Sequence, residues 1–154
     1  MSTLALTPPS YDRIAGTLIA AWQRLHAAHT VAVTRCEEQA RRATEVAAHL
    51  GMTATEFIAC RRRARHAHQP RTPAQKSQQT RFNRSPLARS WAVSMTRAEW
   101  SERDTRKRLA EAARSLVALA GYADAAALTG LSPAQVAGLC RVGARRAARP
   151  PTYR

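Results

Sequence analysis

Residues 44–63 read TEVAAHLGMTATEFIACRRR, a pattern typical of two helices that cross closely and are joined by a tight turn. Ala47 supplies the small side chain that a close crossing requires, and Gly51 can adopt the positive φ of the turn. Thr53 and Glu56 have the spacing of a capping box, which predicts a second helix after Thr53. The apolar side chains expected to hold the two helices together are those of Val46, Leu50, Met52, Phe57 and Cys60. The stretch predicts a helical unit that ends in a helix–turn–helix.

A second stretch, residues 124–146, reads DAAALTGLSPAQVAGLCRVGARR and repeats this pattern at an offset of 79 residues. Gly130 takes the turn position and Ser132 the N-cap position, with Gln135 closing a second capping box. Pro133 stands at the first helical position, where its missing N–H costs nothing. The residues identical in the two copies are Ala47/Ala126, Ala48/Ala127, Gly51/Gly130 and Arg62/Arg141. The sequence therefore predicts an internal duplication.

The rest of the chain is rich in alanine and poor in aromatic residues, which favours helices. Residues 69–95 hold three prolines, several Ser, Thr and Gln, and no apolar periodicity, so they are predicted to form a linker. Thr96 and Glu99 have capping-box spacing, which predicts a helix from Thr96 to about Ala120. The expected organisation is a flexible arm (1–9), a first helical unit (10–68), a basic linker (69–95), a second helical unit (96–148) and a tail (149–154). The expected fold is thus all-α, with two small units that each end in a helix–turn–helix.

The net charge of +15 is concentrated in two segments without a single acidic residue. Residues 57–98 carry ten Lys or Arg, and residues 125–154 carry five Arg, whereas the rest of the chain is neutral. The 23 Arg against two Lys point to a GC-rich genome, but codon usage does not remove acids from two particular stretches. This distribution predicts a polyphosphate partner, that is, a nucleic acid.

Both stretches resemble the helix–turn–helix superfamily of bacterial transcriptional regulators. The first is especially similar to the type in region 4 of sigma factors, and the second to those of small phage and plasmid regulators. The resemblance implies that the second helix of each motif enters a major groove. In the first copy the base-facing positions would be Thr53, Ala54, Thr55, Ile58, Ala59 and Arg62. In the second they would be Ser132, Pro133, Ala134, Ala137, Gly138 and Arg141, with Gln135 as a further hydrogen-bonding group.

The arginines around these helices are expected to bind phosphates. The expected contacts after the first motif are Arg61, Arg63 and Arg65, those in the linker are Arg71, Lys76, Arg81 and Arg84, and those at the C-terminal end are Arg145 and Arg146. A solvated helix end and a merely solubilising linker are the alternatives for these charges.

These features lead to the expectation of a sequence-specific double-stranded DNA-binding protein, a small bacterial regulator of plasmid or phage type that grips adjacent major grooves. A DNA-packaging subunit or a nucleoid-associated protein, with helices used for a homo-oligomer, is the alternative. The second motif could instead dock on RNA polymerase or another protein. Recognition of RNA by aromatic stacking is disfavoured, because the chain has only two phenylalanines.

Enzymatic and metal-dependent functions are not expected. No catalytic constellation stands out, and Cys36, Cys60, His66 and His68 lack the paired short spacing of structural zinc sites, so no cofactor is predicted. Three widely spaced cysteines indicate a reducing compartment. Because no leader-like segment or apolar run of membrane-spanning length is present, a cytoplasmic protein at the nucleoid is expected, with no membrane partner.

Overall fold

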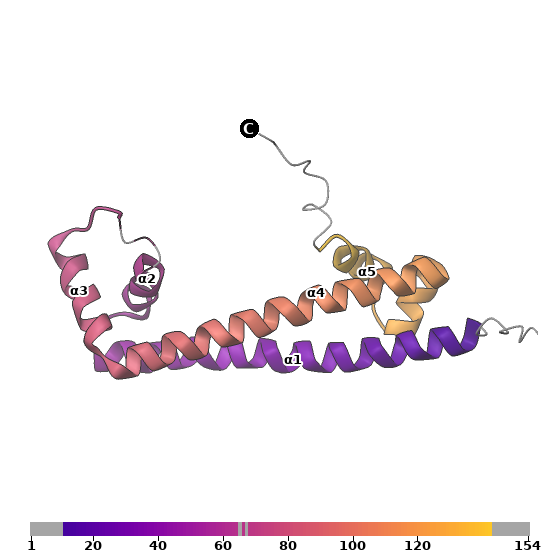
Figure 1. Cartoon of the computed structure of the whole chain (residues 1–154), viewed down its shortest axis with the longest axis horizontal. Coiled ribbons are helices and arrows are strands. Elements are labelled where there is room, and N and C mark those ends of the chain that lie inside the picture. Colours follow the sequence, from indigo (N-terminus) through magenta and orange to yellow (C-terminus); the bar gives the residue numbers. More distant parts are fainter. Residues whose placement is uncertain (1–10, 65, 67, 143–154) are drawn as a thin grey trace, which may run out of the picture. The chain divides into compact units, whose positions relative to one another are not determined.

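The computed structural model describes residues 11–64, 66 and 68–142, and this part of the chain is helical without a strand. Its five helices are α1 (Tyr11–His49), α2 (Ala54–Ala64), α3 (Pro73–Arg84), α4 (Pro86–Thr129) and α5 (Pro133–Cys140) (Figure 1). Helix α4 contains one break, at Gly121, where φ is 79° and ψ is 173°. The predicted all-α class is confirmed.

The helices form two compact units that differ from the predicted ones. The central unit consists of residues 31–102, and the terminal unit combines residues 11–30 with 103–142. The predicted units, 10–68 and 96–148, each followed the chain without interruption. Instead, α1 and α4 each supply one half to each unit. Pairing between segments about 90 residues apart leaves no local signal in the sequence, and for this reason the boundaries were missed.

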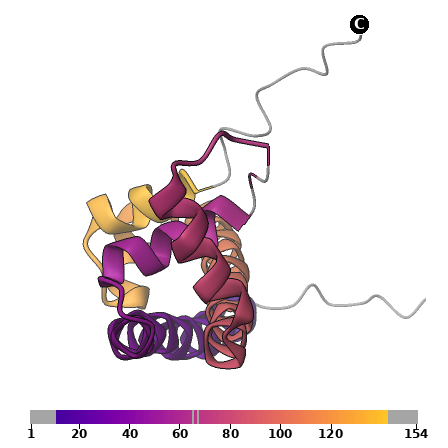
Figure 2. The same cartoon turned by 90° about the vertical axis from the view of Figure 1, so that its left-hand side faces the viewer.

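An aromatic cluster lies at the centre of the central unit. The ring of Phe57, which is fully buried on α2, lies 5.1 Å from that of Phe82 and 4.6 Å from that of Trp91. The Trp91 Nε1–H donates a hydrogen bond of 2.8 Å to the backbone oxygen of Gln39. Figure 2 looks onto this unit, with α2 and α3 above the end of α1 and the start of α4. The cluster therefore joins α2 and α3 to both long helices.

The predicted linker, residues 69–95, is not a linker. Thr72 caps α3 through a capping box with Gln75, Pro73 stands in the first turn, and α4 follows directly from Pro86. Phe82 and Trp91, both almost completely buried, anchor the two helices in the central core. The polar composition was misleading because two buried aromatic side chains, together with hydrogen bonds from polar residues to α2 and to the turn that follows α1, hold this segment in place.

The boundaries of the long helices also differ from the predicted ones. Helix α1 runs without interruption from Tyr11 to His49. Helix α4 begins ten residues before Thr96, whose hydroxyl donates to the Ala92 carbonyl oxygen at 2.8 Å instead of capping a helix. The predicted helix end near Ala120 is confirmed by the break at Gly121.

The terminal unit has its own apolar core. Its buried members are Trp22, Leu109, Ala113, Leu116, Ala125, Ala126 and Val136. Arg114 closes the end of α5, because its Nη1 donates to the carbonyl oxygens of Cys140 at 3.2 Å and Val142 at 2.8 Å. The unit thus combines the first half of α1 with the second half of α4 and with α5.

Candidate nucleic-acid interface

The two predicted turns have the same backbone geometry. Gly51 and Gly130 both have positive φ, 63° and 71°. The Met52 N–H donates to the Ala47 carbonyl oxygen at 3.0 Å, and the Leu131 N–H donates to that of Ala126 at 3.2 Å. This bond between residues five apart closes a helix end through a left-handed residue, a conformation that glycine adopts without strain.

Both helices that follow the turns begin with a reciprocal capping box. The Thr53 N–H donates to Glu56 Oε2 at 2.9 Å, and the Glu56 N–H donates to Thr53 Oγ1 at 3.2 Å. Ser132 and Gln135 make the same pair of bonds at 2.8 and 3.2 Å. The two stretches therefore share the geometry of their turns and capping boxes. The preceding helices differ, since the break at Gly121 leaves only a short helix before the second turn.

Glu56 links the start of α2 to α3. Its Oε1 accepts a hydrogen bond of 2.8 Å from Gln78 Nε2. The pKa of Glu56 lies below its ordinary value, chiefly because the carboxylate accepts the backbone hydrogen bond of Thr53, with smaller contributions from Gln78 and Arg81. The cap thus depends on a charged carboxylate.

Helix α2 presents one face to the core and one to solvent. Phe57 and Cys60 are buried, whereas Thr55 and Arg62 are exposed. Ile58 and Ala59 are half-buried and lie between Thr55 and Arg62 at helical spacing. The outer stripe of α2, defined here as Thr55, Ile58, Ala59 and Arg62, consists of four of the six positions predicted to face bases. Of the other two, Thr53 is exposed at the N-cap and Ala54 is half-buried.

The Arg61 side chain is bonded to two residues of α4 within the central unit. Its guanidinium makes two hydrogen bonds to the Glu99 carboxylate, at 2.7 and 2.6 Å, and one to Thr96 Oγ1 at 3.0 Å. It also lies 5.8 Å from the centroid of the Trp91 ring. The hydrogen bonds to Glu99 raise the pKa of Arg61 above its ordinary value. The predicted phosphate contact is therefore reassigned to a structural link between α2 and α4.

Three more arginines of the predicted phosphate-binding set hold backbone or side-chain groups of the same unit. Arg81 Nη1 donates to the carbonyl oxygens of Leu50 at 2.9 Å and Gly51 at 3.3 Å, where α1 ends. Arg71 Nη2 donates to the Arg63 carbonyl oxygen at 3.1 Å. Arg63 Nη2 donates to Gln78 Oε1 and to Cys60 Sγ, both at 3.2 Å. Sequence reasoning missed these roles because the acceptors are mostly backbone oxygens supplied by another segment.

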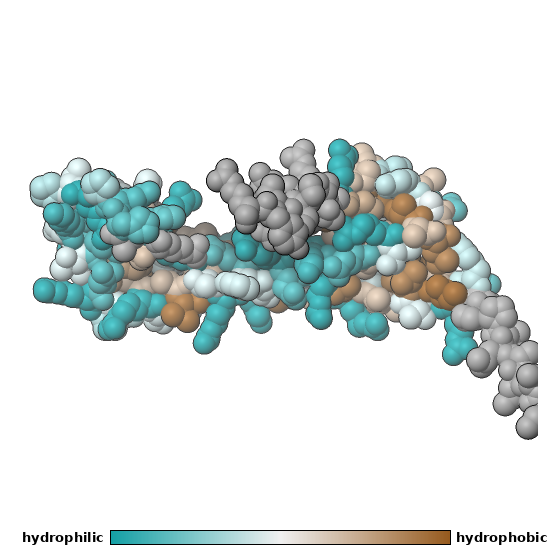
Figure 3. Space-filling view, turned by 45° about the horizontal axis from the view of Figure 1, so that its top comes forward, coloured by the Kyte–Doolittle hydropathy of each residue, from teal (hydrophilic) through white to brown (hydrophobic). Residues whose placement is uncertain are grey.

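Three of the predicted DNA contacts in the central unit point to solvent. Arg62, Lys76 and Arg84 are exposed, and their side chains make no hydrogen bond or ion pair with any residue that the structure describes. Figure 3 shows mostly hydrophilic surface over α2 and α3. Three further predicted contacts, Arg65, Arg145 and Arg146, lie outside the described residues.

The second turn offers fewer groups for base recognition. Ser132 and Gln135 are exposed but bind each other in the capping box. Arg141 is exposed, and its Nε donates to the Ala137 carbonyl oxygen at 3.2 Å. The outward positions Ala134 and Gly138 carry little or no side chain. The exposed face of α5 therefore offers few side chains that could contact a base.

The described residues offer neither a metal site nor a single membrane-spanning helix. Within residues 11–64, 66 and 68–142, no three His, Cys, Asp or Glu side chains are grouped so that they could hold a metal ion. No single helix there has the length and apolarity to cross a membrane, and only α4 and α5, bent by 120°, pass that test as a pair. The chain matches no family model, and no curated protein and no solved structure is significantly similar to it.

Proposed function

We propose that this protein binds double-stranded DNA with sequence preference, through insertion of α2 into the major groove. The observation that carries the proposal is the outer stripe of α2. It is one row of exposed (Thr55, Arg62) and half-buried (Ile58, Ala59) side chains on a helix whose start is fixed by the Gly51 turn and the Thr53–Glu56 capping box. Arg62 can bond guanine, and the small Thr55 and Ala59 let the helix lie deep enough to contact thymine methyl groups.

The charge of the central unit supports the same function. Residues 31–102 contain 13 Lys or Arg against six acids, a net charge of +7. Because four arginines are engaged internally, the phosphate contacts fall to the exposed Lys76 and Arg84, which leaves Arg62 for the bases. Lys76 and Arg84 lie on α3, which packs against α2 through Phe82 and Phe57. These side chains would bind the backbone while α2 reads the bases.

The role of α5 is assigned differently. Its outward face carries small side chains and one arginine. It would therefore either lie against the DNA and bind a phosphate through Arg141, or dock on a protein such as RNA polymerase. The resemblance of both turns to bacterial helix–turn–helix regulators favours a small transcriptional regulator of plasmid or phage type.

The proposal is tested by selecting bound sequences from random DNA with the full chain, followed by titrations of single variants. Thr55→Ala and Arg62→Ala should relax the preference at one or two base pairs, by about 1–3 kcal/mol for a good contact. Lys76→Ala should weaken binding to all sequences alike and reduce the slope of log K against log salt by about one. Arg24→Ala, an exposed arginine on the first half of α1, is the matched control. Recovery of no motif, together with equal effects of Arg62→Ala and Arg24→Ala, would exclude base reading by α2.

A structural or assembly role on DNA, as in a packaging subunit or nucleoid protein, is the second candidate. It is favoured by Trp100 and Val93 on α4, whose exposed fractions are 68% and 52%. The two side chains are seven residues apart and therefore lie on the same face of the helix, two turns apart. Large exposed aromatic side chains are typical of protein interfaces. Concentration-dependent self-association that is lost in Trp100→Ala, with DNA binding independent of sequence, would favour this candidate over the regulator.

A further inference from the structure

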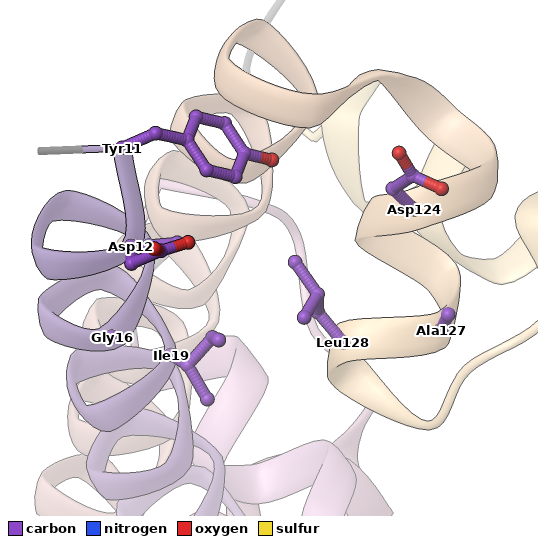
Figure 4. Close-up of a pocket in the computed structure, with 8 residues that line it drawn as sticks. Tyr11, Asp12, Gly16, Ile19, Asp124, Ala127 and Leu128 are labelled. Carbon is purple, nitrogen blue, oxygen red and sulfur yellow. The ribbon is translucent and has the colours of Figure 1, made fainter.

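A groove in the terminal unit lies between the start of α1 and the last turns of α4, residues 124–128 (Figure 4). It has a volume of about 440 Å³, and its walls are mainly apolar, with Ile19 on one side and Leu128 extending from the other. The ring of Tyr11 stands at one end. Gly16 also lines the groove, and a Cβ built on it would meet nothing within 4 Å. No described side chain therefore fills the space beside Gly16.

The charges at this groove are the reverse of those on the rest of the chain. The terminal unit has only four acidic residues, Asp12, Asp104, Glu111 and Asp124. Asp104 pairs with Arg108 and Glu111 with Lys107, each one helical turn away. Asp12 and Asp124 make no ion pair or hydrogen bond with a described residue, and both line the groove. The two acids of this unit that form no ion pair with a described residue thus both line this groove.

We propose that this groove binds a small organic cation with an apolar body, such as an aryl or alkyl ammonium or phosphonium ion. The apolar walls would cover the body, the Tyr11 ring would face the cation, and the two carboxylates would balance its charge. The size favours a small molecule, because about 440 Å³ lies within the range of small-ligand pockets. A stable protein partner would need roughly 20–30 residues on each side, whereas eight line this groove.

Binding can be measured by equilibrium dialysis of the full chain against tetraphenylphosphonium, in the absence of DNA, so that the result is independent of the proposed DNA binding. Because the chain carries a net charge of +15, non-specific attraction of a cation is not expected, and saturable uptake would indicate a local site. Asp12→Asn and Asp124→Asn should each weaken uptake about two- to fivefold, and the double variant about tenfold. Asp104→Asn, which removes the same charge from the same unit, should leave it unchanged. Tetraphenylborate, which has the same shape and the opposite charge, should show no dependence on Asp12 or Asp124.

Gly16→Leu is the second test, because it fills the groove and keeps every charge. Leucine is a better helix former than glycine, and Gly16 has ordinary helical backbone, so the variant should retain its helical circular dichroism and lose phosphonium uptake. The proposal is overturned if wild-type protein shows no saturable uptake at millimolar phosphonium. It is equally overturned if uptake is the same in the Asp12→Asn/Asp124→Asn variant or in folded Gly16→Leu.

Discussion

Arg61 and Arg62 are neighbours in sequence, yet the structure predicts opposite consequences when each is replaced by alanine. Arg61→Ala removes two charge-assisted hydrogen bonds to Glu99, one to Thr96 and the packing over Trp91. Hydrogen bonds to charged groups contribute about 1.5–3 kcal/mol each when buried. The Glu99 side chain is 40% exposed, so water replaces part of the loss, and we expect a net cost of about 1–2 kcal/mol. For a unit of 72 residues with a total stability of about 4–11 kcal/mol, this is a substantial fraction.

The assay is urea-induced unfolding followed by circular dichroism, with Arg62→Ala as the matched control. Arg62 is exposed and has no partner among the described residues, so its replacement should change stability by less than about 0.5 kcal/mol. A double-mutant cycle of Arg61→Ala with Glu99→Gln should show a coupling energy of about 1 kcal/mol. Equal stability of the two alanine variants, or strict additivity in the cycle, would refute the structural role of Arg61.

Three further predictions concern the central unit. Phe82→Ala should destabilise it by about 3–5 kcal/mol, which thermal unfolding will detect; a neutral effect would mean that residues 69–95 are a detached linker after all. Gly51→Val should cost at least about 1–2 kcal/mol, since φ is 63° and a Cβ would lie 3.4 Å from Arg81 Nη1; a Tm equal to that of wild type would argue against this turn. The lowered pKa of Glu56 stabilises the fold above the ordinary pKa of 4.5, and this stabilisation is lost as the pH falls through the lower value. Urea titrations between about pH 5 and pH 3 should therefore show a shallower decline for Glu56→Gln than for wild type.

The two turns were predictable because every interaction that defines them is local. Gly51, Thr53 and Glu56 act on backbone groups within five residues, and their equivalents at the second turn do the same. All the residues that specify such a turn therefore lie within one short stretch of sequence. The outer stripe of α2 followed from the same window, since the buried Phe57 and Cys60 fix which face remains outside.

What the sequence did not predict depends on partners far along the chain. Arg61 and Glu99 are 38 residues apart, and Arg81 reaches back 30 and 31 residues to the end of α1. A count of charges in the sequence treats every arginine as available to bind phosphate, although four of them hold the central unit together. Helix α3 was missed because its composition is polar, but the capping-box pattern of Thr72 and Gln75 was present in the sequence and could have identified its start.

The pairing of residues 11–30 with residues 103–142 sets an order for folding during synthesis. At about 5–20 residues per second, the 72 residues of the central unit take several seconds to emerge after the start of α1. During that time the central unit can complete its aromatic core, whereas Trp22 and its neighbours have no partner until Leu109 and Leu116 have been made. The apolar stripe around Trp22 is thus made before the central unit but buried after it, and it is the segment that a chaperone would have to shield.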